Sequence, residues 1–222
     1  MSYSDFYETR YGKESNDSPR MLLIKTILPM MRIGSRILDF GCGDGQIAEM
    51  ISKQNEVIGL EYSRTASKKA RERGIKVIIS RKPRTPFPNE RFDTVLAIEV
   101  IEHLVDTGTF FNECNRILSK KGRLLITTPN LACLANRFRL LFGKTPNFME
   151  SEFNEKKGLA GHLRIFTIDM LKELAEEHGF RLINHKTTAI YFPSSRTVIP
   201  FFGNVFPSLG ETIIAEFEKI RN

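Results

Sequence analysis

The sequence predicts a single α/β domain, residues 1–222, built on a doubly wound and mostly parallel sheet. Short apolar segments alternate with amphipathic segments from about residue 19 to residue 180. A glycine-rich loop follows the first of these apolar segments, as is typical of the edge of a parallel sheet that binds a ligand. The length of 222 residues allows one such domain with a sizeable core.

The first half of the chain contains three predicted helices and four predicted strands. Ser18 and Pro19 suit the N-cap and first turn of a helix that runs toward Pro29. Strands are expected at 36–40, 56–61, 76–79 and 94–98, with helices at 46–53 and 65–73 between the first three strands. Strands separated by helices in this way pair in parallel through right-handed crossovers.

The second half begins in the same rhythm and then departs from it. An apolar stripe predicts a helix around 110–118, and a fifth strand at 123–128 stops at Pro129. Helices at 131–142 and 167–178 and strands at 181–186 and 212–217 complete the chain. We expect the segments 131–161 and 191–210 to cover the acceptor side of a site. Ordinary packing at the edge of the core, a membrane-surface contact and a dimer interface are the alternatives.

Composition limits the cellular setting. No segment reaches the roughly 18 apolar residues that a membrane-spanning helix needs, and the polar N-terminus lacks a secretory apolar region. The cysteines at 42, 114 and 133 show no CxxC spacing and cannot all pair. We therefore predict a cytoplasmic protein.

The charge distribution allows two interpretations, one of which implies an RNA partner. The net charge is +7, and between residues 64 and 84 nine basic side chains accompany one acidic side chain. A solvated helix face followed by a surface loop is the expected structure, and an RNA-binding stripe is the alternative. No aromatic residue interrupts this run, which disfavours a stacking platform for single-stranded nucleic acid.

The glycine-rich loop contains the most informative residues. Gly41, Gly43 and Gly45 follow the first strand, and glycine is needed where the backbone turns at positive φ or approaches a ligand closely. The spacing does not complete a dinucleotide-binding motif, because Gln46 stands where glycine or alanine is required. The loop is therefore predicted to bind a ligand other than a dinucleotide.

Acidic residues around the loop indicate the charge of that ligand. Asp39 precedes the glycines and Asp44 lies between the last two. Carboxylates repel pyrophosphate but suit a ligand with an ammonium and a sulfonium group. Glu61 ends the second strand, 22 residues after Asp39, where an acid can accept hydrogen bonds from both hydroxyls of a ribose.

The motif ILDFGCGDG and the turn TPFPNERFD resemble those of class I S-adenosylmethionine-dependent methyltransferases over roughly residues 20 to 218. The chain is similar to the methyltransferase type 11 and 23 group, with some likeness to ubiquinone-biosynthesis O-methyltransferases and methionine-biosynthesis protein W. The resemblance implies a Rossmann-like, seven-stranded sheet with an antiparallel last strand. It also implies S-adenosylmethionine as cofactor, bound by Asp39, Gly41, Cys42, Gly43, Gly45, Glu61, Tyr62 and Ser80. Ser80 departs from the pattern, which usually has an acid there to bind the adenine amino group.

Candidate catalytic residues follow the fourth strand. Glu99, Glu102 and His103 have the spacings that place side chains on one face of a helical turn. His103 is a candidate general base for an acceptor that must lose a proton, and a role in orienting the loop is the alternative. The sequence lacks an NPPY or DPPY motif after this strand, so the common signature of amino and amide methylation is missing.

The same residues also suit a divalent metal. Glu99, Glu102, His103 and His162 offer carboxylate oxygens and imidazole nitrogens. The set resembles the two-glutamate, two-histidine magnesium site of small-RNA 3′-end 2′-O-methyltransferases. The metal site and the metal-free base both remain open.

We predict an S-adenosylmethionine-dependent methyltransferase that methylates oxygen on a small-molecule or lipid-like acceptor. An RNA methyltransferase is the alternative within this class. A catalytically silent S-adenosylmethionine-binding accessory protein is the alternative from another class. None of the motifs selects the acceptor or the oligomeric state.

Overall fold

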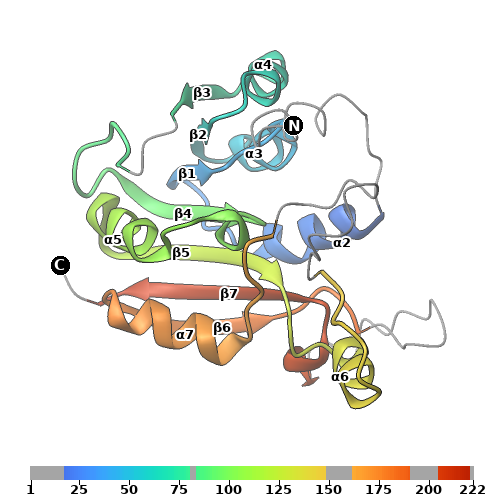
Figure 1. Ribbon diagram of the computed structural model, residues 1–222. Helices are drawn as coiled ribbons and strands as arrows, with labels where there is room; N and C mark the ends of the chain where they lie inside the picture. The colour runs from blue at the N-terminus through green and yellow to red at the C-terminus, as the bar shows by residue number, and fades with distance from the viewer. Residues whose placement is uncertain (1–17, 81–83, 149–161, 191–204, 221–222) are drawn as a thin grey trace.

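The computed structural model describes residues 18–80, 84–148, 162–190 and 205–220. They form a seven-stranded sheet in the order β3-β2-β1-β4-β5-β7-β6 (Figure 1). β7 runs antiparallel to both of its neighbours, and the other pairs are parallel. The strands are β1 (Arg36–Phe40), β2 (Glu56–Glu61), β3 (Lys76–Ile79), β4 (Phe92–Ile98), β5 (Leu118–Pro129), β6 (Phe180–Lys186) and β7 (Thr212–Lys219).

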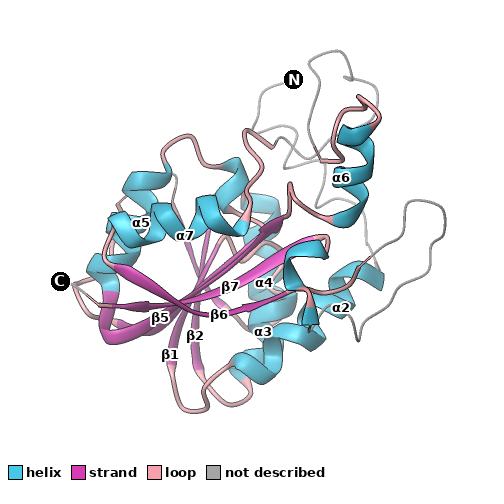
Figure 2. Cartoon of the chain, turned by 90° about the horizontal axis from the view of Figure 1, so that it is seen from below, coloured by secondary structure: helices cyan, strands magenta, loops and turns pink. Residues whose placement is uncertain are grey.

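Helices cover both faces of this sheet (Figure 2). One face packs against α5 (Thr107–Ile117) and α7 (Ile168–Glu177). The other packs against α2 (Ser18–Ile27), α3 (Gln46–Ser52) and α4 (Arg64–Glu72). The remaining elements are α6 (Leu134–Leu141) and the 3-10 helices η1 (Leu28–Met30), η2 (Ile101–His103) and η4 (Pro207–Leu209). The predicted doubly wound α/β architecture is confirmed.

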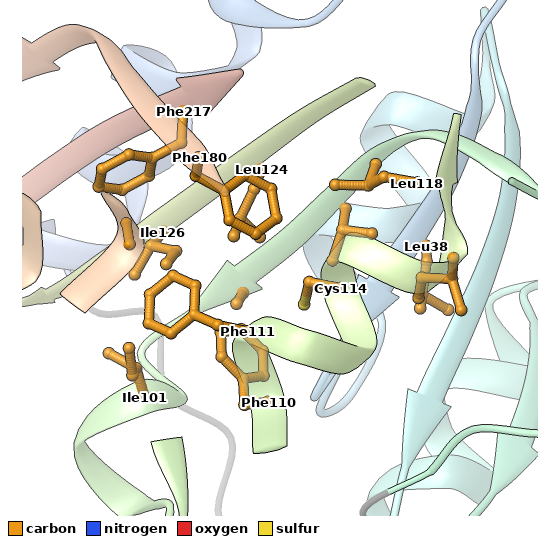
Figure 3. Close-up of a cluster of buried hydrophobic side chains, with 14 of the residues drawn as sticks. Leu38, Ile101, Phe110, Phe111, Cys114, Leu118, Leu124, Ile126, Phe180 and Phe217 are labelled. Atoms are coloured by element: carbon orange, nitrogen blue, oxygen red, sulfur yellow. The ribbon is translucent and has the colours of Figure 1, made fainter. Parts of the chain in front are cut away.

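The larger core cluster lies under α5 and α7. Phe110 and Phe111 of α5 are buried against β4 and β5, and the ring of Phe111 lies 6.0 Å from that of Phe180. Ile101 belongs to the same cluster (Figure 3). Because Ile101 begins η2, the core fixes the short turn that follows β4.

The strands β1, β2 and β3 have the bounds expected from the sequence. The helix expected at 131–142 begins three residues later, at Leu134. The side chain of Asn130 explains the delay, because its Oδ1 accepts the N–H of Ala132 at 2.9 Å and forms a turn ahead of the helix.

The two expected cover segments are described in part. Residues 131–148 include α6, and residues 205–210 include η4, while 149–161 and 191–204 lie outside the described residues. Among the helices of the described part, none is long and apolar enough to cross a membrane.

Candidate functional site

The glycine-rich loop between β1 and α3 takes the conformation that its sequence predicts. Gly41, Gly43 and Gly45 have φ angles of 77°, 56° and 79°. A Cβ atom on Gly41 would lie 2.6 Å from Val100, and one on Gly45 would lie 2.7 Å from Ala70. Positive φ and close packing therefore both require glycine at these two positions.

Glu61 holds this loop against the end of β2. Its Oε2 accepts the N–H of Gly43 at 2.9 Å, and its Oε1 accepts the N–H groups of Tyr62 and Ser63, each at 2.8 Å. The side chain is buried, so these amides stabilise its charge and fix its position. The residue predicted to bind ribose thus lies directly beside the glycine loop.

Cys42 and Asp39 are both buried beneath the loop. A Cβ on Gly59 of β2 would lie 2.5 Å from the Cys42 sulfur, so the glycine makes room for the thiol. Burial raises the pKa of the Cys42 thiol, and the nearby carboxylates of Asp39 and Glu61 raise it further. Cys42 is consequently a neutral packing residue of the loop and not a nucleophile.

The expected adenine-binding position follows β3. The N–H of Ser80 donates to the carbonyl oxygen of Glu61 at 3.1 Å, which places Ser80 beside the end of β2. Ser80 and Tyr62 are both half-buried. The basic residues 81–82 lie outside the described part of the chain.

A second group of polar side chains lies at the ends of β4 and β5. Glu102, in η2, has a completely buried side chain whose Oε2 accepts the hydroxyl of Thr128 at 3.0 Å. Its carbonyl oxygen accepts the N–H of Leu163 at 2.9 Å. The backbone of Glu102 therefore fixes the segment that contains His162.

Two histidines lie beside this buried carboxylate. Glu102 Oε1 is 3.9 Å from His103 Nε2 and 4.0 Å from His162 Nε2, and the imidazole centroids are 4.9 Å apart. One ligand atom from each residue lies within 4.8 Å of the other two. The structure thus brings residues 59 positions apart in the sequence into one cluster, Glu102–His103–His162.

The carbonyl oxygen of Phe148 determines the tautomer of His162. His162 Nδ1 lies 3.0 Å from this oxygen, which can only accept, so Nδ1 carries the hydrogen. The lone pair of the neutral ring is then on Nε2, facing Glu102. Phe148 has a φ of 67°, an unfavourable angle for a residue with a side chain. A histidine oriented by a carbonyl is typical of metal ligands and of general bases.

Glu99 does not share a helical turn with Glu102 and His103, so that expectation was wrong. Glu99 has a φ of 54°, and η2 begins only at Ile101. Its carboxylate accepts the Thr127 hydroxyl at 2.8 Å, and it is not part of the mutually close group formed by Glu102, His103 and His162. The structure gathers three of the four predicted metal-binding residues.

Four of the nine basic residues of the run lie in α4. The helix buries Ala66, Ser67 and Ala70 and directs its longer side chains outward. Arg73 bonds to Glu49 at 2.9 Å and to the carbonyl of Asp44 at 3.1 Å. Arg73, the C-cap of α4, thus links this helix to the glycine loop and to α3.

Thr127 and Thr128 are site residues that the sequence interpretation missed. Both are buried at the end of β5, where they donate to Glu99 and Glu102. The sequence offered one signal for them, because both residues end the predicted fifth strand, which follows β4 in the chain. Polar residues at that edge are typical of a ligand site.

Known proteins share this sequence pattern. A family model described as a methyltransferase domain matches residues 14–185. A ubiquinone biosynthesis O-methyltransferase of Bradyrhizobium diazoefficiens is 37% identical over 103 residues, 44% of this chain and 41% of the relative. An S-adenosylmethionine-dependent methyltransferase of Mycobacterium tuberculosis is 36% identical over 97 residues, 42% of this chain and 35% of the relative. The matched region thus spans less than half of either relative.

Solved structures share the fold. A SAM-dependent methyltransferase from Thermotoga maritima superposes with a TM-score of 0.67 at 20% identity, covering 98% of this chain and 92% of that one. A methyltransferase solved in complex with the Haloferax volcanii Trm112 activator gives a TM-score of 0.70 at 14% identity, with 100% and 99% coverage. At these identities the likeness concerns the fold alone.

Proposed function

The chain belongs to the S-adenosylmethionine-dependent methyltransferases, and from this premise we propose that it methylates an oxygen atom of a small-molecule or lipid-like acceptor. S-adenosylmethionine is the methyl donor. The cluster Glu102–His103–His162 is the observation that supports oxygen as the target. A hydroxyl acceptor must lose a proton, and the cluster offers an imidazole nitrogen with a free lone pair.

The proposed reaction is a direct displacement. The acceptor oxygen attacks the methyl carbon, the carbon–sulfur bond breaks, and the sulfonium leaves as a neutral thioether. The hydroxyl proton passes to Nε2 of His162 or to an imidazole nitrogen of His103. The buried carboxylate of Glu102 stabilises the imidazolium that forms. Positioning of the donor supplies much of the remaining rate enhancement.

The donor site is proposed at the carboxyl ends of β1, β2 and β3. The glycine loop and Asp39 would hold the methionine part, and Glu61 the ribose. Support comes from the fixed, buried carboxylate of Glu61 beside Gly43. The complete proposed set is Asp39, Gly41, Cys42, Gly43, Gly45, Glu61, Tyr62 and Ser80.

A divalent metal is the second form of the proposal. Glu102, His103 and His162 supply the oxygen and nitrogen donors that such an ion prefers, with their ligand atoms within 4.8 Å. Glu99 is the fourth candidate ligand. When bound, the ion would orient the acceptor hydroxyl and lower its pKa.

We also propose that the protein acts in the reducing cytoplasm. Its three cysteines, at 42, 114 and 133, are free and buried. Free thiols are the rule in that compartment, which supports the proposal.

Methyl transfer from isotope-labelled S-adenosylmethionine tests the proposal. Paired acceptors that differ only in a hydroxyl or an amino group should give product with the hydroxyl compound. His103→Ala and His162→Ala identify the base, because replacing the histidine that accepts the proton should lower kcat by about 100-fold. His185→Asn, on the edge strand β6 and outside this cluster, is the control.

The outcomes separate the alternatives. Loss of activity on chelation, with recovery on adding Mg²⁺ or Zn²⁺, would support the metal-dependent form. Activity that survives chelation but not the His103 substitution would support the metal-free base. Product from the amino compound alone would contradict oxygen methylation, and salt-sensitive labelling of RNA alone would favour the RNA alternative. Donor binding without product from any acceptor would favour the accessory protein.

A further inference from the structure

The helix α6 reverses the usual arrangement of polar and apolar side chains. Its single buried residue is Asn136, which donates to the carbonyl of Asn130 at 3.3 Å and accepts the N–H of Asn147 at 2.6 Å. Four large apolar residues at its end are exposed, and we call them the α6 tip: Phe138, Leu140, Leu141 and Phe142. Leu141 is 75% exposed and Phe142 is 70% exposed. A polar anchor thus holds the helix while its apolar residues face outward.

The shape of the α6 tip suits a fluid partner better than a flat protein surface. Leu140, Leu141 and Phe142 are consecutive, so their side chains spread over roughly 200° around the helix axis. A flat surface contacts about half of a helix circumference, whereas lipid can surround the end of one. The chain turns away immediately afterwards at Gly143, whose φ is 63°. The apolar side chains therefore form the projecting end of a loop.

The positive charge around the α6 tip favours anionic lipids. Residues 131–148 contain three cations, Arg137, Arg139 and Lys144, and no acidic residue. Arg137 Nε donates to Ala132 O at 2.7 Å and Arg139 Nε donates to Thr145 O at 2.6 Å. In the described part of the chain no carboxylate forms an ion pair with any of the three cations. Cations beside exposed apolar side chains complement anionic headgroups above an acyl phase.

We propose that the α6 tip docks this protein on an anionic lipid bilayer, with Leu141 and Phe142 inserted among the acyl chains. The helix α6 lies beyond the carboxyl end of β5 (Figure 1). Thr128, at that end of β5, donates to Glu102. Phe148, whose carbonyl binds His162, follows Phe142 by six residues. Docking would therefore bring the cluster Glu102–His103–His162 near the bilayer, although the surface itself does not depend on the proposed reaction.

Vesicle co-sedimentation of the full chain tests this proposal. Vesicles of phosphatidylcholine alone are compared with vesicles of phosphatidylcholine and phosphatidylglycerol in equal parts. The wild-type protein should bind the anionic vesicles and lose affinity as salt is added. Leu141→Glu combined with Phe142→Glu should weaken binding at least about tenfold. Replacing Arg137, Arg139 and Lys144 by glutamine should weaken it on the order of 100-fold, at about fivefold per cation.

A matched control is available before the amino end of β1, whereas α6 follows the carboxyl end of β5. Ile33 is also 75% exposed and precedes β1, so Ile33→Glu should leave vesicle binding unchanged. Unfolding midpoints identify the variants that keep the wild-type fold, and only these are compared. We call the double substitution Leu141→Glu and Phe142→Glu the tip variant. Equal vesicle binding by the tip variant and by Ile33→Glu would overturn the proposal. A dimer that the tip variant abolishes, without vesicle binding by the wild type, would overturn it too and assign the α6 tip to a second copy of the chain.

Discussion

Glu61 is the residue that connects the fold to the proposed donor site. Its carboxylate receives three backbone N–H groups from the glycine loop and the end of β2. The sequence alone predicted this residue from its place at the end of a strand. It could not predict the hydrogen bonds, because these depend on how the loop folds back over the strand.

The substitution Glu61→Gln should weaken S-adenosylmethionine binding on the order of tenfold to a hundredfold. The amide loses the negative charge, and hydrogen bonds to a charged group contribute about 1.5–3 kcal/mol each. Calorimetric titration of both proteins with the donor measures the effect. Glu56→Gln, at the exposed start of the same strand, should bind like the wild type. Equal affinity in Glu61→Gln would remove this residue from the donor site.

The ion pair between Asp93 and Arg36 should make the free energy of unfolding depend on pH. Both oxygens of its carboxylate accept hydrogen bonds from the Arg36 guanidinium, which lower the pKa of Asp93 to about 2. The stabilisation is present above the unfolded-state pKa of about 4 and is lost as the pH falls toward 2. Because both side chains are partly exposed, solvent screening limits it to about 1 kcal/mol.

Asp93→Asn should therefore unfold more easily than the wild type at pH 7, by about 1 kcal/mol, and equally easily near pH 2. Urea unfolding at several pH values between these limits measures the difference. Glu173→Gln, at an exposed position farther along α7, is the control substitution. A difference between Asp93→Asn and wild type that stays constant with pH would contradict the assignment.

Local sequence patterns explain the strands and most of the helices, and they fail at the start of α6 and at Glu99 for identifiable reasons. Apolar runs bounded by turn residues define β1, β2 and β3 without reference to distant residues. The start of α6 depends on the side chain of Asn130, and the position of Glu99 depends on a left-handed backbone angle. Helical spacing cannot reveal either feature, because each arises from one residue's own conformation or contacts.

The helices α3 and α4 approach each other closely where Gly45, the N-cap of α3, meets Ala70 of α4. Gly45→Ala should destabilise the protein by about 2–4 kcal/mol, since it combines a left-handed backbone with overpacking. The new methyl group would lie 2.7 Å from Ala70 Cβ and 2.8 Å from its Cα. Gly74→Ala is the matched control, because φ there is 81° and no atom lies within 4 Å of the added Cβ. Chemical unfolding should show the larger loss at Gly45, and equal losses would contradict the packing between the two helices.

In the whole molecule, the proposed donor site and the cluster Glu102–His103–His162 both lie at the carboxyl ends of the parallel strands. In the order β3-β2-β1-β4-β5, β1 leads into the glycine loop and β2 ends at Glu61. Glu99 and Glu102 follow β4 and accept hydrogen bonds from Thr127 and Thr128 of β5. The proposed donor residues could be named from the sequence, because their motifs lie within a short stretch of chain. The sequence also grouped His162 with Glu102 and His103, but only the structure shows the contacts that bring it there, through Leu163 and the bridge between Asn130 and Phe166.

The proposed reaction requires the donor's methyl group to lie beside the cluster Glu102–His103–His162. A crystal structure with S-adenosylhomocysteine, the demethylated product, would locate the donor sulfur. The ribose should contact Glu61, and the sulfur should lie about 7 Å from Nε2 of His103 or His162, which leaves room for a methyl group and an acceptor oxygen in line. A sulfur atom more than about 12 Å from both histidines, with the ribose away from Glu61, would contradict the claim.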